Sequence, residues 1–277
     1  MSRLAKFTFI YGVLTLLSLS SQLASAEALF TDGFESNDLS HSEGGVSYGA
    51  SESASVSDAL PRTGNYSLRF RYSAAASGQD SFSEQRVGYS NTSELWIKYD
   101  LFIPANYNHR NDTGPDNNKF LAIYRNPYRT PGFQVNWSLS PNGSGGSNIN
   151  LHRYRNGEEQ STISPAGGIG NDFITSADHG NWIQIIARVK VPSSSSANDG
   201  IMQMWKGTWN GSAWSHTQVT NETTLDCYGG DNENYMSELY LLGWSNSGYT
   251  EETIFYIDNV EINDAPFYIP KSPPVVN

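Results

Sequence analysis

Two residues that can move protons stand close together in one strand-like segment. His152 and Tyr154 are separated by one residue, so an extended strand would place both side chains on the same face. Imidazole and phenol groups serve as general acids and bases, and nearby positive charge favours a tyrosinate and fixes the tautomer of a histidine. Ile149 and Leu151 alternate with these residues, so we expect them to point into a core. The segment therefore predicts an outward face that carries proton-transfer groups.

Basic, amide and aromatic side chains elsewhere in the sequence could complete such a face. Those that could neutralise an anionic substrate are Lys119, Arg125 and Arg188. Those that could hydrogen-bond to a bound ligand or stack against it are Gln134, Asn136, Asn150 and Trp182. An ordinary solvated strand face has the same alternation, so the pattern alone leaves that alternative open.

The elements that must position these residues are β-strands. Runs rich in Val, Ile, Tyr, Phe and Trp, separated by clusters of Gly, Asn, Ser and Pro, predict strands over residues 67–72, 94–103, 119–124, 132–139, 148–154, 182–191, 201–205, 237–243 and 253–262. Arg153 and Arg155 fall on the core side of segment 148–154, so we expect that strand to end or twist outward near His152. The number and spacing of the strands predict an all-β fold, an antiparallel β-sandwich or jelly roll.

The first residues are typical of a secretory signal peptide. Arg3 and Lys6 precede an apolar stretch, residues 7–19, and Ala24-Ser25-Ala26 supplies the small residues that signal peptidase requires. We therefore expect cleavage near Ala26 and a secreted protein, extracellular or periplasmic, with a retained membrane anchor as the alternative. The expected organisation is a signal peptide (1–26), one domain (27–264) and a Pro-rich tail (265–277).

Charge and cysteine content narrow the classes of function. Without Arg3 and Lys6 the chain keeps 15 basic and 28 acidic residues, a net charge of −13. Nucleic acids and anionic membranes bind basic surfaces, so neither is expected as a partner, whereas an anionic polysaccharide can still occupy a locally basic groove.

Cys227 is the only cysteine in the sequence, so an internal disulfide is impossible, and we expect it to be a buried small hydrophobe. Stability must then come from core size or from a metal.

Three separated pieces of sequence resemble a calcium site found at the seam of many carbohydrate-active β-sandwiches. They are Phe34-Glu35, Gly64-Asn65-Tyr66-Ser67-Leu68 and Tyr256-Ile257-Asp258-Asn259-Val260. The resemblance implies a structural Ca²⁺ with Glu35 and Asp258 as side-chain ligands and the Asn65 carbonyl as a main-chain ligand. Calcium suits such a set because it accepts oxygen ligands, carbonyls included, in loose geometry. The alternative is that Glu35 caps a turn and that Asp258 bonds neighbouring backbone.

A second resemblance covers most of the mature chain. Its pieces are Glu94-Leu95-Trp96-Ile97-Lys98-Tyr99-Asp100 with Phe102-Ile103-Pro104, Asn118-Lys119-Phe120, Trp182-Ile183, and Asn198-Asp199-Gly200 with Met202 and Trp205. Together they resemble the concanavalin A-like jelly rolls and, within that group, the polysaccharide lyases of the alginate and glucuronan type. The resemblance implies a sandwich with a curved concave sheet whose groove holds a uronic-acid polymer. It also matches the strand-borne lysine of those enzymes to Lys119.

Lyase chemistry on a uronic acid would give the candidate residues their roles. It needs a cation that neutralises the carboxylate, a base that removes the C5 proton and an acid that protonates the leaving oxygen. We therefore expect a secreted, monomeric polysaccharide lyase that cleaves a uronic-acid-containing polysaccharide by β-elimination. A non-catalytic lectin-like module with the same groove and a secreted structural or adhesive protein are the alternatives. No Glu-x-Asp-x-x-Glu, Gly-x-Ser-x-Gly or His-Glu-x-x-His pattern points to a different catalytic centre.

Overall fold

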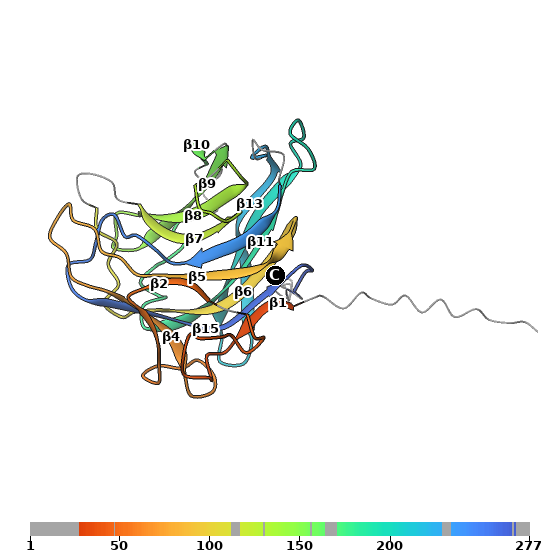
Figure 1. Cartoon of the computed structure of the whole chain (residues 1–277). Helices are drawn as coiled ribbons and strands as arrows, with labels where there is room; N and C mark the ends of the chain where they lie inside the picture. Colours follow the sequence, from red (N-terminus) through yellow and green to blue (C-terminus); the bar gives the residue numbers. More distant parts are fainter. Residues whose placement is uncertain are drawn as a thin grey trace, which may run out of the picture.

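Two antiparallel β-sheets make up the described part of the chain (Figure 1). The computed structural model describes residues 28–46, 48–111, 117–129, 131–155, 157–163, 171–228, 234–267 and 269. The expected signal peptide and most of the expected tail lie outside these residues. Within the described ranges, no helix is long and apolar enough to cross a membrane.

The eight-stranded sheet contains both described ends of the chain. Its order is β13 (Trp214–Leu225), β12 (Gly200–Trp209), β11 (Asn181–Lys190), β6 (Glu94–Ile103), β15 (Thr253–Asn263), β4 (Ser67–Tyr72) and β3 (Ala54–Ser57), with β1 (Ala28–Asp32) also paired to β15. Every pairing is antiparallel. The first and last described strands therefore lie side by side.

The seven-stranded sheet covers the other side of the core. Its order is β10 (Glu158–Ile163), β9 (Ser147–Arg155), β8 (Gln134–Pro141), β7 (Asn118–Tyr124), β14 (Met236–Leu241), β5 (Glu84–Thr92) and β2 (Tyr48–Glu52), again antiparallel throughout. Figure 1 shows β7 and β8 bending rather than lying flat. The prediction of an antiparallel jelly-roll sandwich is confirmed.

Alternation along the strands directs apolar side chains into the space between the sheets. In β11, residues Ile183, Ile185, Ala187 and Val189 are at most 1% exposed. From the facing sheet, Trp137 of β8 is fully buried, and its indole N–H donates to Thr220 Oγ1 at 3.2 Å. Ile149, Leu151 and Cys227 belong to the same buried cluster, as the sequence predicts. Burial on this scale supplies most of the free energy of folding.

Strand β9 continues beyond the point where the sequence suggests that it ends. It pairs with β8 along its whole length to Tyr154, and β10 pairs with it as far as Arg155. Arg153 has the core-side parity, but its guanidinium forms an ion pair with Asp226. The predicted end near His152 is therefore wrong, because an acidic partner compensates the arginine whose charge argued against a longer strand.

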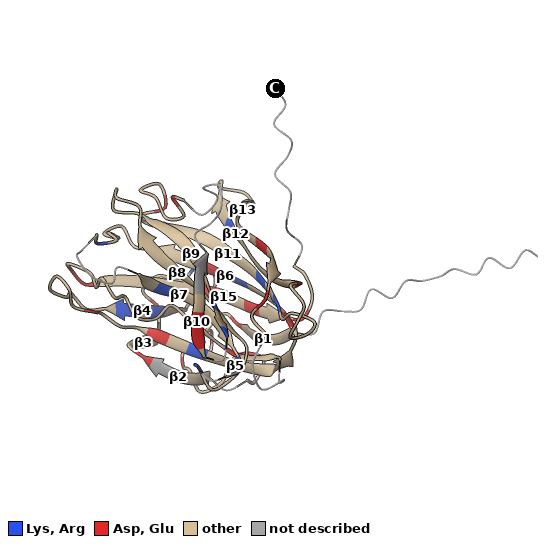
Figure 2. Cartoon of the chain, turned by 90° about the horizontal axis from the view of Figure 1, so that it is seen from above, with Lys and Arg blue, Asp and Glu red and all other residues tan. Residues whose placement is uncertain are grey.

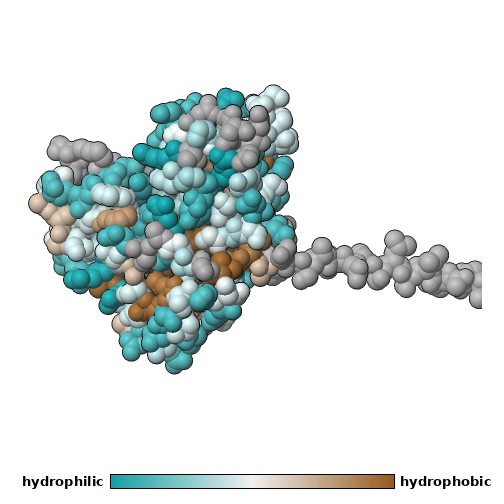
Figure 3. All heavy atoms as spheres, in the orientation of Figure 1, coloured by the Kyte–Doolittle hydropathy of each residue, from teal (hydrophilic) through white to brown (hydrophobic). Residues whose placement is uncertain are grey.

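The surface is acidic and mostly hydrophilic. Figure 2 shows acidic and basic residues distributed over the strands of both sheets. In Figure 3, most of the visible face is hydrophilic, and hydrophobic side chains gather in the lower part of the view. The formal net charge of the full sequence is −11, and the described residues form no broad basic surface of the kind that nucleic acid requires.

A carboxylate near the N-terminal strand holds the loop between β3 and β4. Glu35 accepts hydrogen bonds from the Asn65 N–H at 2.9 and 3.1 Å, the Asn65 Nδ2 at 3.0 Å and the Tyr66 N–H at 3.1 Å. Gly64 makes this approach possible: its φ is +63°, and a Cβ atom there would lie 2.3 Å from Glu35 Oε1. The pKa of Glu35 is lowered because backbone N–H groups stabilise its charged form.

A second carboxylate, from the other end of the chain, holds the same loop. Asp258 of β15 accepts the N–H groups of Arg62 at 2.8 Å and Thr63 at 3.1 Å, and that of Asn259 at 2.7 Å. Its side chain is completely buried. We call this arrangement of Glu35 and Asp258 around residues 62–66 the chain-end clamp.

We predict that Gly64→Ala lowers the free energy of unfolding by about 2 kcal/mol or more. Left-handed backbone costs roughly 1 kcal/mol for alanine, and the added methyl would push Glu35 off its N–H donors at about 1–3 kcal/mol. Gly45→Ala is the matched control, because Gly45 has a φ of +78° but nothing within 4 Å of its Cβ position. Denaturant unfolding should show the larger loss for Gly64→Ala, and equal losses would contradict the clamp.

Candidate active site

The register between β7, β8 and β9 aligns outward side chains in three rows. Cα partners across these strands form the rows Tyr124–Gln134–Tyr154, Ala122–Asn136–His152 and Lys119–Ser138–Asn150. Directly opposed residues have Cβ atoms about 4.5–5.5 Å apart. We call these nine residues the polar face. They lie on the outward side of the seven-stranded sheet, because the alternate residues Val135, Trp137 and Leu151 are in the core.

Most side chains of the polar face are buried although they point away from the core. Gln134, Asn136 and Ser138 are 1–3% exposed, and His152 and Tyr154 are 7% and 4% exposed. A solvated strand face would leave such side chains open to water. The polar face is therefore covered by other parts of the molecule.

The loop after β7 supplies much of this cover. Tyr128 packs edge-on against Tyr124 and Tyr240, with ring centroids 5.0 and 5.6 Å away. The N–H of Arg129 donates to Gln134 Oε1 at 3.0 Å. Aromatic rings thus border the polar face; Tyr124 and Tyr240 are buried, and Tyr128 is the partly exposed ring that can stack against the apolar side of a sugar ring.

Two buried polar atoms on the polar face, Gln134 Nε2 and Asn136 Oδ1, have no hydrogen-bond partner among the described residues. Buried polar groups in folded proteins are nearly always satisfied by protein or water. The nearby hydroxyls of Tyr124 and Tyr240 interact with Glu238 and Tyr128. An amide donor and an amide acceptor beside hydroxyls are groups that can bind the hydroxyl groups of a saccharide.

A chain of hydrogen bonds fixes the His152 ring. Its Nδ1 lies 2.7 Å from Glu159 Oε1 on β10, and its Nε2 lies 2.5 Å from Ser138 Oγ on β8. A carboxylate accepts hydrogen bonds, so Nδ1 carries a proton, and in the neutral ring Nε2 then has the lone pair. The Tyr154 hydroxyl is 3.5 Å from the second oxygen of Glu159. The two proton-transfer candidates therefore share one carboxylate.

Burial shifts the pKa values of the charged and proton-carrying groups of the polar face. It lowers the pKa of Lys119, an effect to which the positive charge of Arg129 adds. Burial, with Tyr128 nearby, raises the pKa of Tyr154 to about 12. Tyr154 is therefore protonated at neutral pH and can donate a proton. Lys119 is a cation that is only partly hydrated.

Two residues expected beside Lys119 lie in the other sheet. Arg188 and Trp182 are on β11, where Arg188 donates to Glu94 at 2.8 Å and lies 5.2 Å from the ring centroid of Trp96. Trp182 packs against Phe102 on the same outward side. Their predicted place at the candidate site is wrong, because alternation assigns a side of a strand but not the sheet to which the strand belongs.

The remaining expected residues divide between the polar face and its border. Lys119, Gln134, Asn136 and Asn150 lie on the face with His152 and Tyr154. Arg125 follows Tyr124 at the end of β7 and therefore has the opposite parity. Its guanidinium carbon lies 5.8 Å from the ring centroid of Tyr235.

Comparison with known proteins identifies the architecture. No protein-family model and no curated protein matches the chain. Among solved structures, the alginate lyase Aly36B in complex with an alginate trisaccharide is 14% identical, with a TM-score of 0.56 over 87% of this chain and 98% of that chain. The PL-14 alginate lyase from Aplysia kurodai is 12% identical, with a TM-score of 0.56 over 87% of this chain and 100% of that chain. The alginate lyase vAL-1 from Chlorella virus is 10% identical, with a TM-score of 0.53 over 86% and 100%.

The chain has the jelly-roll fold of these alginate lyases. At identities of 10–14% the likeness establishes the jelly roll and not its chemistry. The chemistry of this jelly roll therefore depends on its own residues.

The sequence pattern did not identify several residues that shape this jelly-roll site. Ser138 has the same parity as Gln134 and Asn136, and extending that alternation by two residues would have found it. Tyr240 could have been found in the same way from its strand. Glu159 carried no such signal, because its approach to His152 depends on the pairing of β9 with β10.

The expected calcium ligands lie together in the jelly roll, but their contacts do not fit a metal. Both carboxylate oxygens of Glu35 already accept hydrogen bonds from three N–H donors, the Asn65 N–H, the Asn65 Nδ2 and the Tyr66 N–H. Asn65 therefore turns N–H groups, which a metal ion cannot use as ligands, toward Glu35. Within the described ranges, no group of three or more His, Cys, Asp or Glu side chains is placed to hold a metal ion. Calcium at Glu35, Asn65 and Asp258 remains an untested expectation of the sequence resemblance, and the contacts of these residues argue against it.

We predict that the melting temperature of the protein is the same with added calcium and with a chelator. N–H donors satisfy the carboxylates of the clamp, so no cation is needed to hold the loop. Glu35→Gln should lower the melting temperature equally in both conditions. A chelator that destabilises the wild type but not Glu35→Gln would restore the metal site.

Proposed function

We propose that the protein is a secreted polysaccharide lyase that cleaves an anionic, uronic-acid-containing polysaccharide by β-elimination on the polar face. The observation that carries the proposal is that Lys119 on β7 and His152 and Tyr154 on β9 face the same side of one largely buried polar surface, with β8 between them. A cation, a base and an acid are the three groups that this reaction requires. The signal-peptide pattern at the N-terminus supports export to a compartment where such polymers occur.

Lys119 is the group that prepares the substrate. The C5 proton of a uronate becomes acidic only when the charge of the adjacent carboxylate is neutralised. Lys119 is buried enough that its pKa is lowered, so its charge is poorly screened by water and acts strongly on an anion that displaces that water. Among the expected cations, it is the one whose row lies on the polar face.

His152 and Tyr154 divide the two proton transfers. His152 takes the C5 proton at Nε2, where its lone pair lies, and Glu159 stabilises the imidazolium that results. The electron pair of the C5–H bond forms the C4–C5 double bond, and the C4–O bond breaks. Tyr154, protonated because its pKa is about 12, gives its proton to the leaving oxygen. Ser138 holds the Nε2 position until substrate displaces its hydroxyl.

The test is incubation of the mature protein with alginate, glucuronan and glycosaminoglycans while the ultraviolet absorbance of unsaturated uronate ends is followed. We expect absorbance to grow with at least one polymer. Tyr154→Phe should lower kcat by roughly 10²–10⁴-fold, because general acid catalysis contributes that much, and should leave polymer binding largely intact. Tyr256→Phe is the matched control, since Tyr256 packs against Phe102 on the other sheet.

The other outcomes separate the alternative functions. Tight binding of a polymer without any absorbance change would make the protein a lectin-like module. Neither binding nor turnover on any polymer would favour a structural or adhesive protein. Equal loss of activity in Tyr154→Phe and Tyr256→Phe would remove Tyr154 from the reaction.

We predict that lyase activity falls as the pH rises through the lowered pKa of Lys119. The substrate carboxylate must meet a charged lysine, and the charge is lost above that pKa. Lys119→Arg should move the alkaline limb of the kcat/KM profile to higher pH, because a guanidinium stays protonated. An alkaline limb that is identical in the wild type and Lys119→Arg would show that Lys119 does not set it.

A further inference from the structure

A cleft of about 330 Å³ opens in the eight-stranded sheet, at the start of β11 and the end of β12. The side chains that give it chemical character are Arg62, Asp178, Asn181, Trp182, Thr208 and Trp209. A volume of this size falls within the range of small-ligand sites. The cleft and the polar face belong to different sheets, so the proposed lyase reaction leaves its residues unused.

Arg62 is the charged group of the cleft. Its guanidinium carbon lies 4.9 Å from the ring centroid of Trp209 and 5.2 Å from that of Trp214. Its Nε is buried without a hydrogen-bond partner among the described residues, and Arg62 forms no ion pair with any of them. Asp100, which feels its charge, is instead hydrogen-bonded to Gln184. The positive charge of Arg62 is therefore available to a ligand.

The position of Arg62 is fixed by the chain-end clamp. Its backbone N–H donates to Asp258 Oδ2 at 2.8 Å, and the next residue of the loop, Thr63, is held by the same oxygen. Stacking on two indole rings restricts the side chain further. A guanidinium that is held in this way loses little conformational freedom when it binds an anion.

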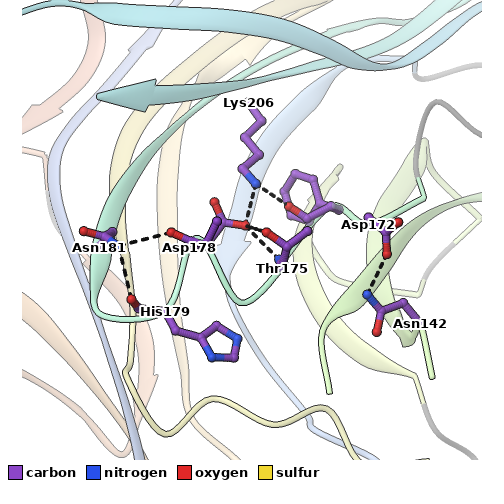
Figure 4. Close-up of polar contacts among 9 residues, drawn as sticks. Asn142, Asp172, Thr175, Asp178, His179, Asn181 and Lys206 are labelled. Atoms are coloured by element: carbon purple, nitrogen blue, oxygen red, sulfur yellow. Dashed lines mark hydrogen bonds and ion pairs between the residues drawn. The ribbon is translucent and has the colours of Figure 1, made fainter. Parts of the chain in front are cut away.

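Part of the cleft is lined by a loop that Asp178 braces, and Figure 4 shows the contacts of this residue. Asp178 Oδ2 accepts the Thr175 N–H at 2.8 Å and the Thr175 hydroxyl at 3.1 Å, and it pairs with Lys206 Nζ at 2.7 Å. Lys206 also donates to the Phe173 carbonyl at 2.7 Å. Lys206 neutralises the Asp178 carboxylate, so this acid does not cancel the charge of Arg62.

Asn181 and Trp209 add the groups that recognise a sugar. The side-chain amide of Asn181 donates to the carbonyls of Ala177 and His179, both at 3.1 Å (Figure 4), which leaves its Oδ1 as a hydrogen-bond acceptor on a residue that lines the cleft. Trp209 is 43% exposed, so part of its indole is open to solvent. An open indole beside polar groups can stack on the apolar face of a pyranose ring.

We propose that this cleft is a second carbohydrate site, which binds an acidic sugar unit through its carboxylate. Arg62 pairs with the carboxylate, Trp209 stacks on the ring and Asn181 Oδ1 accepts a hydroxyl. The choice of a uronate as the ligand rests on the proposed function, whereas the cleft itself does not. Because the site lies in the other sheet, it holds polymer without competing for the polar face.

The experiment is calorimetric titration of an alginate trisaccharide into the Tyr154→Phe protein, in which turnover is strongly slowed and binding is expected to be retained. We expect two sites per chain. Adding Arg62→Gln should weaken one of them by roughly tenfold or more, because a charge-assisted hydrogen bond is lost, and should leave the other unchanged. Arg71→Gln is the matched control: it removes the same charge from the same sheet, where Arg71 pairs with Glu252 outside the cleft.

Each outcome decides between the two sites. A single site that Arg62→Gln leaves intact overturns the cleft but not the lyase. A single site that is lost in Arg62→Gln supports the cleft and removes the polar face as a binding site. A neutral cello-oligosaccharide that binds the cleft equally well with and without Arg62 overturns the acidic ligand. A lower melting temperature of Arg62→Gln would leave open whether the loss of binding comes from misfolding, so Arg62→Lys is then tested as well. This variant keeps the positive charge but lacks the planar guanidinium. Partial weakening of one site in Arg62→Lys supports the proposal.

Discussion

The register of β7 against β8 and β9 is the constraint on which the candidate site depends. A shift of one residue in β8 would turn Gln134, Asn136 and Ser138 into the core and bring Val135 and Trp137 out to the surface. Because such a shift would expose a fully buried tryptophan and bury three polar side chains, the core selects the register. The rows of the polar face are thus set by the hydrophobic residues on the other side of the same strands.

An irregularity in β7 refines this arrangement. The pairing with β8 shifts between Lys119 and Leu121, so Phe120 and Leu121 are both buried in the core. Lys119 therefore lies outward together with Ala122 and Tyr124, although strict alternation would separate them. Because of this register shift, Lys119 lies on the same side of the sheet as His152 and Tyr154.

Much of the fold could be predicted from the sequence, because long apolar strands alternate clearly. All nine expected strands are present, and the predicted core face of β9 is correct. The strands that were missed include β5 and β13, whose sequences are rich in polar residues or glycine because these strands are less buried. The candidate site was harder to predict from the sequence. Alternation along the strand identified His152 and Tyr154, but it could not show that Arg188 belongs to the other sheet. The contact of Glu159 with His152 depends on which strands pair, and alternation does not reveal this.

Burial of polar groups gives the polar face its chemical character. Atoms such as Gln134 Nε2 and Asn136 Oδ1 are costly to bury without a partner, and a saccharide that supplies hydroxyl groups would recover that cost. The same cover that removes water strengthens the field of Lys119. On the other sheet, the chain-end clamp also has two effects: it holds the loop at residues 62–66, and it fixes the position of Arg62.

The most direct test of this account is a crystal structure of the Tyr154→Phe protein with a bound uronate oligosaccharide. The account predicts sugar density across β7, β8 and β9, with a carboxylate at Lys119. A glycosidic oxygen should lie beside the edge of the substituted phenyl ring, where the Tyr154 hydroxyl stands in the wild type. Density confined to other surfaces, with only ordered water over the polar face, would contradict it.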